Sequence, residues 1–153
     1  MQFTEQMLQQ ITMDVCQSML GLELVPVNSP IDSARLLVAA VEIRGARHTV
    51  VEVFAHDQLM ASIAETMFAS ERGSLTEAEI RDAFCEIANM IGGNVKGSFG
   101  EEADLSLPIF GSADDSLENL PQGSLRTTFD CCGHPLTIVL REVVSNPEPV
   151  AAT

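Results

Sequence analysis

Basic residues are scarce in this chain. Only 8 Lys and Arg are set against 22 Asp and Glu, which gives a formal net charge of −14 at pH 7. A surface this negative repels phosphate backbones and anionic lipid head groups. We therefore expect neither nucleic acid nor a membrane surface as a partner, whereas a protein partner with a local basic or mixed patch is compatible with this charge.

Cysteine pairs at CxxC spacing are also missing. The four cysteines are Cys16, Cys85, Cys131 and Cys132, so neither a disulfide framework nor a zinc ribbon is predicted. Cys131, Cys132 and His134 lie at a predicted hairpin turn, where adjacent side chains point to opposite faces of the sheet. We expect no metal site there.

Long apolar runs are absent as well. A membrane-spanning helix needs about 18 consecutive apolar residues, and no such run exists. The first ten residues, MQFTEQMLQQ, lack the basic and apolar regions of a signal peptide. With reduced thiols expected in addition, these features predict a cytoplasmic protein.

What the chain does contain is enough apolar sequence for one core. Although Trp and Tyr are absent, 46% of the 153 residues are hydrophobic, which is typical of a folded domain of this size. We expect a single domain over residues 1–145 and a disordered tail over residues 146–153.

The order of the predicted elements favours an α+β fold. Amphipathic helices are expected over 4–20, 57–70 and from Thr76 to about Asn94, the last beginning with a capping box formed by Thr76 and Glu79. A polar loop is expected over 111–124. The predicted strands are a hairpin of 35–44 with 48–55, a hairpin of 125–132 with 134–144, and two short strands at 22–27 and 105–110. Helix, strands, two helices and strands in this order indicate a largely antiparallel sheet with the helices packed on it.

The third predicted helix carries two contrasting rows of residues. At 100° per residue, one apolar stripe forms the predicted core side: Ile80, Phe84, Ile87, Ile91 and Val95. The opposite side carries a row at spacing i, i+4, i+7 and i+11, which we call the polar row: Asp82, Glu86, Asn89 and Gly93.

The simplest interpretation of the polar row is a solvated helix face. Three features favour a function instead. The like charges of Asp82 and Glu86, one turn apart, cost a few tenths of a kcal/mol. Asn89 in mid-helix costs roughly half a kcal/mol relative to Ala. Gly93 costs about 1 kcal/mol and removes bulk, which lets another backbone approach. Several local rules broken together are typical of a functional site.

The chemistry of the row is limited to one carboxylate and one carboxamide a turn apart. No histidine or evident nucleophile lies nearby in the sequence. An Asn side chain is both donor and acceptor, so it can orient a water molecule but hardly deprotonate one. A Glu can pair with a cation. Such a set suits a protein that completes another protein's active site by positioning water.

The pattern of Asp82, Glu86 and Asn89, an acid followed by three spacers, Glu, two spacers and Asn, resembles the signature of the CheC/CheX/FliY family of chemotaxis phosphatases. The continuation ANMIGGNVKG and Pro108 within LSLPIF resemble the CheX branch most. The resemblance covers the order of elements across most of residues 1–145 and implies a single CheC-like domain.

The number of motifs also points to the CheX branch. CheC and FliY forms usually carry two such helices, whereas the helix predicted over 57–70 offers Glu65 but only Phe68 three residues later. One motif is present, as in CheX. Because the CheX branch is dimeric, the resemblance implies a homodimer.

The resemblance also implies a mechanism. Family members remove the phosphoryl group from the aspartate of a phosphorylated CheY-type response regulator. Glu86 is then expected to pair with the regulator's active-site lysine, and Asn89 to align the attacking water. Asp82 and Gly93 are expected to contact the partner, Gly93 by leaving room for it. The regulator supplies Mg²⁺, so no cofactor is expected on this chain.

Two other interpretations stay open. A non-catalytic module of the CheX fold would bind a response regulator or another signalling protein without accelerating phosphate loss. A scaffold domain would leave the polar row unexplained. The acidic run over 101–118 is expected to be a solvated loop, with steering of a partner as its alternative.

Overall fold

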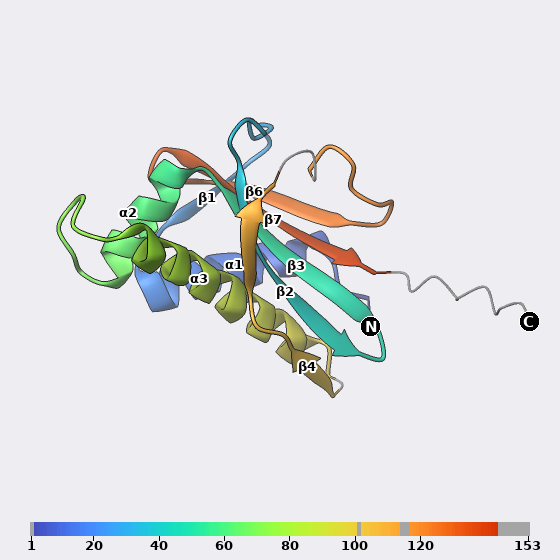
Figure 1. Cartoon of the computed structure of the whole chain (residues 1–153). Coiled ribbons are helices and arrows are strands. Elements are labelled where there is room, and N and C mark those ends of the chain that lie inside the picture. The colour runs from blue at the N-terminus through green and yellow to red at the C-terminus, as the bar shows by residue number, and fades with distance from the viewer. Residues whose placement is uncertain (1, 101, 114–116, 144–153) are drawn as a thin grey trace, which may run out of the picture.

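The computed structural model describes residues 2–100, 102–113 and 117–143 (Figure 1). The expected tail over 146–153 and its boundary at 145 lie outside this part of the chain. The elements in order are α1 (Glu5–Leu20), β1 (Leu24–Val27), β2 (Leu37–Gly45), β3 (His48–Ala55), α2 (Asp57–Met67), α3 (Glu77–Ser98), β4 (Ala103–Leu105), β5 (Ile109–Ser112), β6 (Leu125–Cys131) and β7 (His134–Glu142).

The strands form one antiparallel sheet in the order β1-β6-β7-β3-β2-β4, with β5 also paired to β2. This confirms the predicted α+β class and both predicted hairpins. Among the described strands β1 pairs with β6 alone and is an edge strand, a position in which a proline such as Pro26 is tolerated although it has no N–H.

The helices pack on one face of the sheet (Figure 1). The main core joins Leu8 of α1, Ile63 of α2 and Ile87 of α3 to inward-facing strand residues such as Val41 and Val53. On the other face, a smaller apolar cluster includes Ile31, Leu36, Ala113 and Leu117 from the connecting segments. Because side chains alternate along β2, Val41 contacts the helices while Glu42 points to the outer face.

Helix α3 is longer than predicted, since it continues past Asn94 to Ser98. The apolar stripe extends to the fully buried Val95, and the Asn94 side chain donates a hydrogen bond to the Met90 carbonyl at 2.8 Å. Burial of the last turn therefore outweighs the low helix propensity of the two glycines.

Helix α2 is shorter than predicted and ends at Met67 rather than near Ser70. Ala69 adopts a left-handed conformation with φ 49°. The Ser70 N–H then bonds to the Glu65 carbonyl at 2.9 Å, which is the arrangement that closes many helix C-termini.

The predicted strand over 105–110 is wrong in its middle. Two strands flank the break, and Pro108 lies between β4 and β5 rather than inside a strand. The same strands show that the acidic run over 101–118 is not simply a loop, and β5 takes the first two residues of the predicted loop over 111–124. No helix in the part of the chain that the structure describes is long and apolar enough to cross a bilayer.

Candidate functional site on helix α3

Helix α3, which carries the polar row, is fixed by a capping box at its start and by its buried apolar stripe. At its start, the Thr76 N–H donates to the Glu79 carboxylate at 2.9 Å, and Thr76 Oγ1 accepts from the Glu79 N–H at 3.2 Å. This capping box was predicted and is confirmed. The side chains that anchor the helix are at most 1% exposed: Phe84, Ile87, Ile91 and Val95. Only Ile80 of the predicted stripe is partly exposed.

The four residues of the polar row lie on the side of α3 that faces away from this core. Asp82 and Glu86 are exposed, and Asn89 and Gly93 are half-buried. Within residues 2–100, 102–113 and 117–143, the side chains of Asp82, Glu86 and Asn89 form neither a hydrogen bond nor an ion pair. The carboxylates and the carboxamide are thus free to bind groups from outside the chain.

The two adjacent glycines, Gly92 and Gly93, differ in the space available for a side chain. A Cβ atom at Gly92 would lie 2.4 Å from Cγ2 of Val41, so Gly92 allows α3 to pack directly against β2. A Cβ atom at Gly93 would lie 3.9 Å from Cδ2 of Leu105, an ordinary contact. Packing within this chain therefore explains Gly92 but not Gly93.

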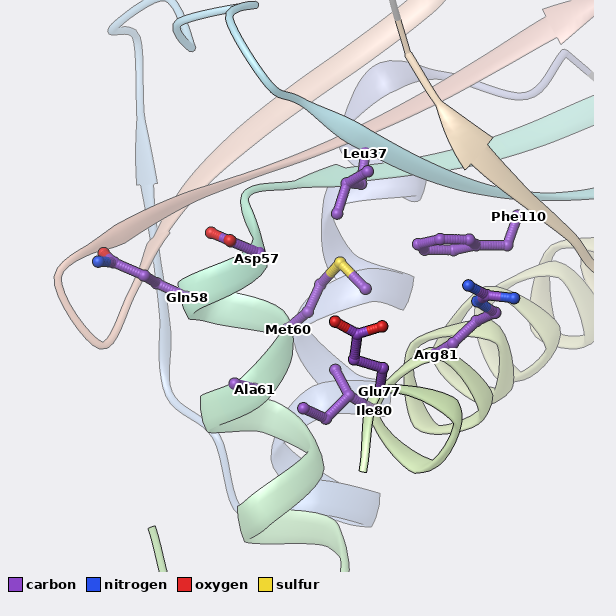
Figure 2. A pocket seen from close by; sticks show the side chains of 9 residues that line it. All are labelled: Leu37, Asp57, Gln58, Met60, Ala61, Glu77, Ile80, Arg81 and Phe110. Carbon is purple, nitrogen blue, oxygen red and sulfur yellow. The ribbon is translucent and has the colours of Figure 1, made fainter. Parts of the chain in front are cut away.

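One flank of the polar row is lined by residues that the sequence did not single out. The Arg81 guanidinium carbon lies 5.1 Å from the ring centre of Phe110, and this ring meets Phe84 edge to face at 6.4 Å. Figure 2 shows Arg81 and Phe110 side by side at the mouth of a groove. The groove, of about 450 Å³, lies between α2 and the first turns of α3, and its lining residues are Leu37, Asp57, Gln58, Met60, Ala61, Glu77, Ile80, Arg81 and Phe110.

The signal that could have found Arg81 is its charge, because it is one of only 8 basic residues and directly precedes Asp82. Phe110 gave no signal, since its contact with α3 depends on where β5 joins the sheet.

Cys85 lies beside the polar row but is not activated as a nucleophile. Burial raises the pKa of its thiol, and the nearby Asp82 carboxylate raises this pKa further. The thiol is therefore held protonated, whereas a nucleophilic cysteine needs the thiolate. This agrees with a packing role for Cys85.

The two cysteines of the second hairpin differ in burial. Cys131 is fully buried and pairs with His134 across the hairpin, while Cys132 is exposed. Burial raises the pKa of the Cys131 thiol to about 12. Among the described residues, no group of three or more His, Cys, Asp or Glu side chains is placed to hold a metal ion.

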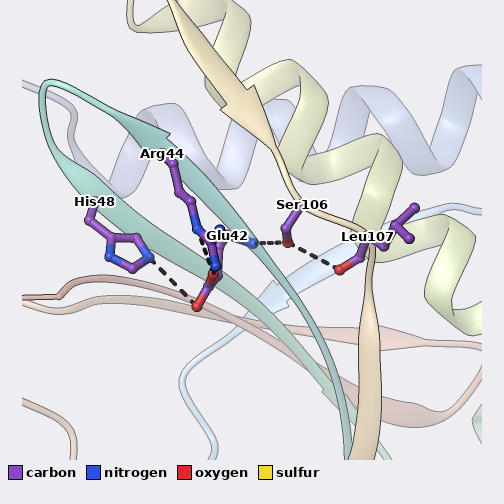
Figure 3. Close-up of polar contacts among 5 residues, drawn as sticks. All are labelled: Glu42, Arg44, His48, Ser106 and Leu107. Carbon is purple, nitrogen blue, oxygen red and sulfur yellow. Dashed lines mark hydrogen bonds and ion pairs between the residues drawn. The ribbon is translucent and has the colours of Figure 1, made fainter.

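The outer face of the sheet carries a different polar cluster, made of Glu42, Arg44 and His48 (Figure 3). Arg44 forms an ion pair with the Glu42 carboxylate, and Nε2 of His48 lies 3.6 Å from it. The hydrogen bond from Arg44 lowers the pKa of Glu42, with further lowering by His48. Unlike the polar row, these groups are paired with one another.

Comparison with known proteins places these features in a family context. A family model described as chemotaxis phosphatase CheX matches residues 37–131, more than half of the chain. No match was found among curated protein sequences.

Solved structures of low sequence identity share the fold. A CheX chemotaxis protein from Vibrio vulnificus superposes with a TM-score of 0.70 at 20% identity, over 89% of this chain and 96% of that one. CheX in a CheX–CheY–BeF3–Mg²⁺ complex from Borrelia burgdorferi gives 0.71 at 16% identity, over 90% and 96%. FliY from Thermotoga maritima gives 0.54 at 13% identity, over 91% of both chains.

Proposed function

This chain belongs to the chemotaxis phosphatase CheX family, and from that premise we propose that it dephosphorylates the phospho-aspartate of a CheY-type response regulator. The observation that carries the proposal is the polar row, in which Glu86 and Asn89 face outward, without partners among the residues that the structure describes, on a helix anchored by its core. The structural neighbour solved as a complex with CheY supports a regulator of this type as partner.

The reaction needs little from this chain beyond position. A water molecule attacks the phosphorus, the bond between phosphorus and the aspartate oxygen breaks, and inorganic phosphate and the free carboxylate result. The Asn89 carboxamide accepts and donates hydrogen bonds, so it can hold the water in line with the breaking bond. Alignment of this kind contributes to rate by removing the entropy cost of bringing the reactants together.

Glu86 is assigned to pairing with the active-site lysine of the regulator, which fixes how deeply Asn89 enters the pocket. Asp82 and Gly93 are assigned to partner contact, since Asp82 is exposed and packing within this chain does not explain Gly93. Mg²⁺ belongs to the regulator's site, and the row offers no nucleophile that would carry a phosphoryl group. The proposal includes a cytoplasmic location and a homodimer, as in the CheX branch.

The test is phosphate release from a radiolabelled CheY-type regulator of the same genome. Wild type is compared with Glu86→Ala and Asn89→Ala, and with Asn94→Ala as the matched control. Asn94 lies on the same helix, outside the polar row, and its side chain bonds to the Met90 carbonyl. We expect wild type and Asn94→Ala to accelerate release and the two row variants to lose this acceleration.

Two results would contradict the proposal. If wild type binds a phosphorylated receiver domain but does not speed phosphate loss, the chain is a non-catalytic module of the CheX fold. The same conclusion follows if Asn89→Ala changes affinity alone and leaves the rate at saturation intact.

A further inference from the structure

Arg81 is an exposed arginine on helix α3, next to the first residue of the polar row. Three arginines in or next to the strands, Arg44, Arg47 and Arg141, each form an ion pair with a glutamate. Arg81 forms neither an ion pair nor a hydrogen bond with the residues that the structure describes. Its guanidinium is therefore available to a carboxylate of another molecule.

The ring of Phe110 fixes the place of this positive charge. The Arg81 guanidinium carbon lies 5.1 Å from the ring centre (Figure 2). The ring meets the fully buried Phe84 edge to face at 6.4 Å, so it is itself anchored to the core. A ring face attracts a guanidinium and leaves its N–H groups for other acceptors. A cation held in this way loses less side-chain freedom on binding than a mobile one does.

Helix geometry places Arg81 at the edge of the polar row. Residues four apart are neighbours on a helix surface, so Arg81 begins a line that continues through Cys85 to Asn89. Asp82 and Glu86 form the line beside it. Position 81 is two turns before Asn89, about 12 Å along the helix axis at 1.5 Å per residue.

The thiol of Cys85 lies close to the charges of both Asp82 and Arg81. Burial raises the pKa of this thiol, the Asp82 carboxylate raises it further, and the Arg81 guanidinium lowers it. Because Cys85 lies between Arg81 and Asn89 on the helix, the contact with Phe110 has not carried the positive charge out of reach of the row.

The size of a specific interface brings Arg81 into contact with whatever binds Asn89. A specific protein complex buries about 800 Å² on each partner, which corresponds to a patch about 30 Å across. A patch of that size centred on Asn89 includes position 81, about 12 Å away. A receiver domain bound over the polar row therefore also covers Arg81.

The chemistry of a phosphorylated receiver indicates which group Arg81 meets. Protein sites for Mg²⁺ use one or two carboxylates together with phosphate oxygens, so such a receiver presents negative charge around its phospho-aspartate. This chain has a net charge of −14, and without a local cation it would repel that site. Arginine binds a carboxylate through two parallel N–H···O bonds. Arg81 thus complements the carboxylates of the receiver, as Glu86 complements its lysine.

We propose that Arg81 pairs with a carboxylate of the receiver domain next to its phosphorylated aspartate and thereby strengthens binding of the regulator. This inference rests on the proposed function and adds a binding residue to it. Asn89 acts at the reacting group, whereas Arg81 sets the affinity and takes no part in the chemical step.

The experiment compares wild type with Arg81→Gln and Arg81→Lys, and with Arg126→Gln as a matched control. The control also removes one positive charge, but from β6, which β7 and β3 separate from the strand β2 that packs against α3. Dissociation constants are measured with a beryllofluoride-activated CheY-type receiver at low and high salt, and KM and kcat with the phosphorylated receiver. Circular dichroism and thermal unfolding check that each variant is folded.

We expect Arg81→Gln to raise Kd and KM by about 3-fold to 10-fold, as loss of a charged hydrogen-bonded pair does, with kcat at saturation unchanged within about twofold. The difference from wild type should shrink between about 0.05 M and about 0.5 M salt, because salt screens the pair. Arg81→Lys should lie between the two, since lysine keeps the charge but not the paired N–H groups. Arg126→Gln should match wild type.

Unchanged Kd and KM in Arg81→Gln would overturn the inference and leave the proposed function intact. A lower kcat with unchanged KM would also overturn it, because Arg81 would then act in the chemical step. If wild type neither binds nor dephosphorylates any receiver, the proposed function fails and the inference fails with it. If light scattering shows that Arg81→Gln alone has lost a wild-type dimer, Arg81 contacts a second copy of this chain, and the assignment to a receiver is overturned.

Discussion

The outer face of the sheet and the helix side of the molecule differ in whether their polar groups are paired. On the outer face of the sheet, Glu42 pairs with Arg44 and Glu52 pairs with Arg141. On the helix side, Glu86 and Asn89 have no partner among the residues that the structure describes. Paired groups stabilise a sheet surface by themselves, whereas an unpaired row on a rigid helix indicates groups that are satisfied only when a second molecule binds.

The largest expected effect separates activity from stability. Asn89→Ala should lower kcat by about 100-fold or more, because a misplaced water loses the alignment that drives the reaction. The free energy of unfolding should change by less than about 0.5 kcal/mol, since the side chain forms no hydrogen bond with the residues that the structure describes. Parallel phosphatase assays and urea titrations would measure both. A large loss of stability would contradict this prediction, because it would mean that Asn89 contributes to the fold as the paired groups of the outer face do.

The two adjacent glycines offer the next contrast. Gly92→Ala should destabilise the chain by about 1–3 kcal/mol, because the added Cβ would lie 2.4 Å from Val41 and the helix must shift. Gly93→Ala should be neutral or stabilise by up to about 1 kcal/mol, because its Cβ meets only an ordinary contact. Thermal unfolding of the two variants checks this difference, and equal Tm values would contradict it.

Breaking the ion pair between Glu52 and Arg141 should have the opposite effects to Asn89→Ala, namely a loss of stability without a loss of activity. Nε of Arg141 donates to Glu52 at 2.9 Å, and Glu52 is 7% exposed. Glu52→Ala leaves Arg141 without its partner and should cost about 1–2 kcal/mol, because Arg141 is still partly solvated. Phosphatase kcat should not change. Reduced kcat in the folded variant would mean that the outer face also supports the site.

The smallest expected effect is the pH dependence from Glu42. Its pKa lies below the ordinary value of 4.5 because Arg44, and then His48, favour the carboxylate. The stabilisation is therefore present above pH 4.5 and is lost as the pH falls through the lower folded pKa. Glu42→Gln should remove this acid-side dependence. Its size is small because solvent screens these exposed groups. Urea titrations of the two proteins at several pH values between about 3 and about 6 would test this, because that range spans the ordinary pKa of a Glu side chain.

The fold was predictable where local patterns and tertiary packing agree. The period of the strands, the turn residues and the capping box at Thr76 gave the element order and the antiparallel class. Predictions failed where packing overrode local preference. Helix α3 was predicted to end near Asn94, but burial of Val95 accompanies its continuation to Ser98.

The sequence by itself determined the spacing of Asp82, Glu86, Asn89 and Gly93, because a helix of 3.6 residues per turn brings those positions to one side wherever it packs. Only the tertiary structure decided what borders them. The Arg81 stack on Phe110 depends on where the edge strand β5 joins the sheet, and the close packing at Gly92 depends on β2 lying directly against α3. Such contacts join residues far apart in the chain, and no local periodicity encodes them.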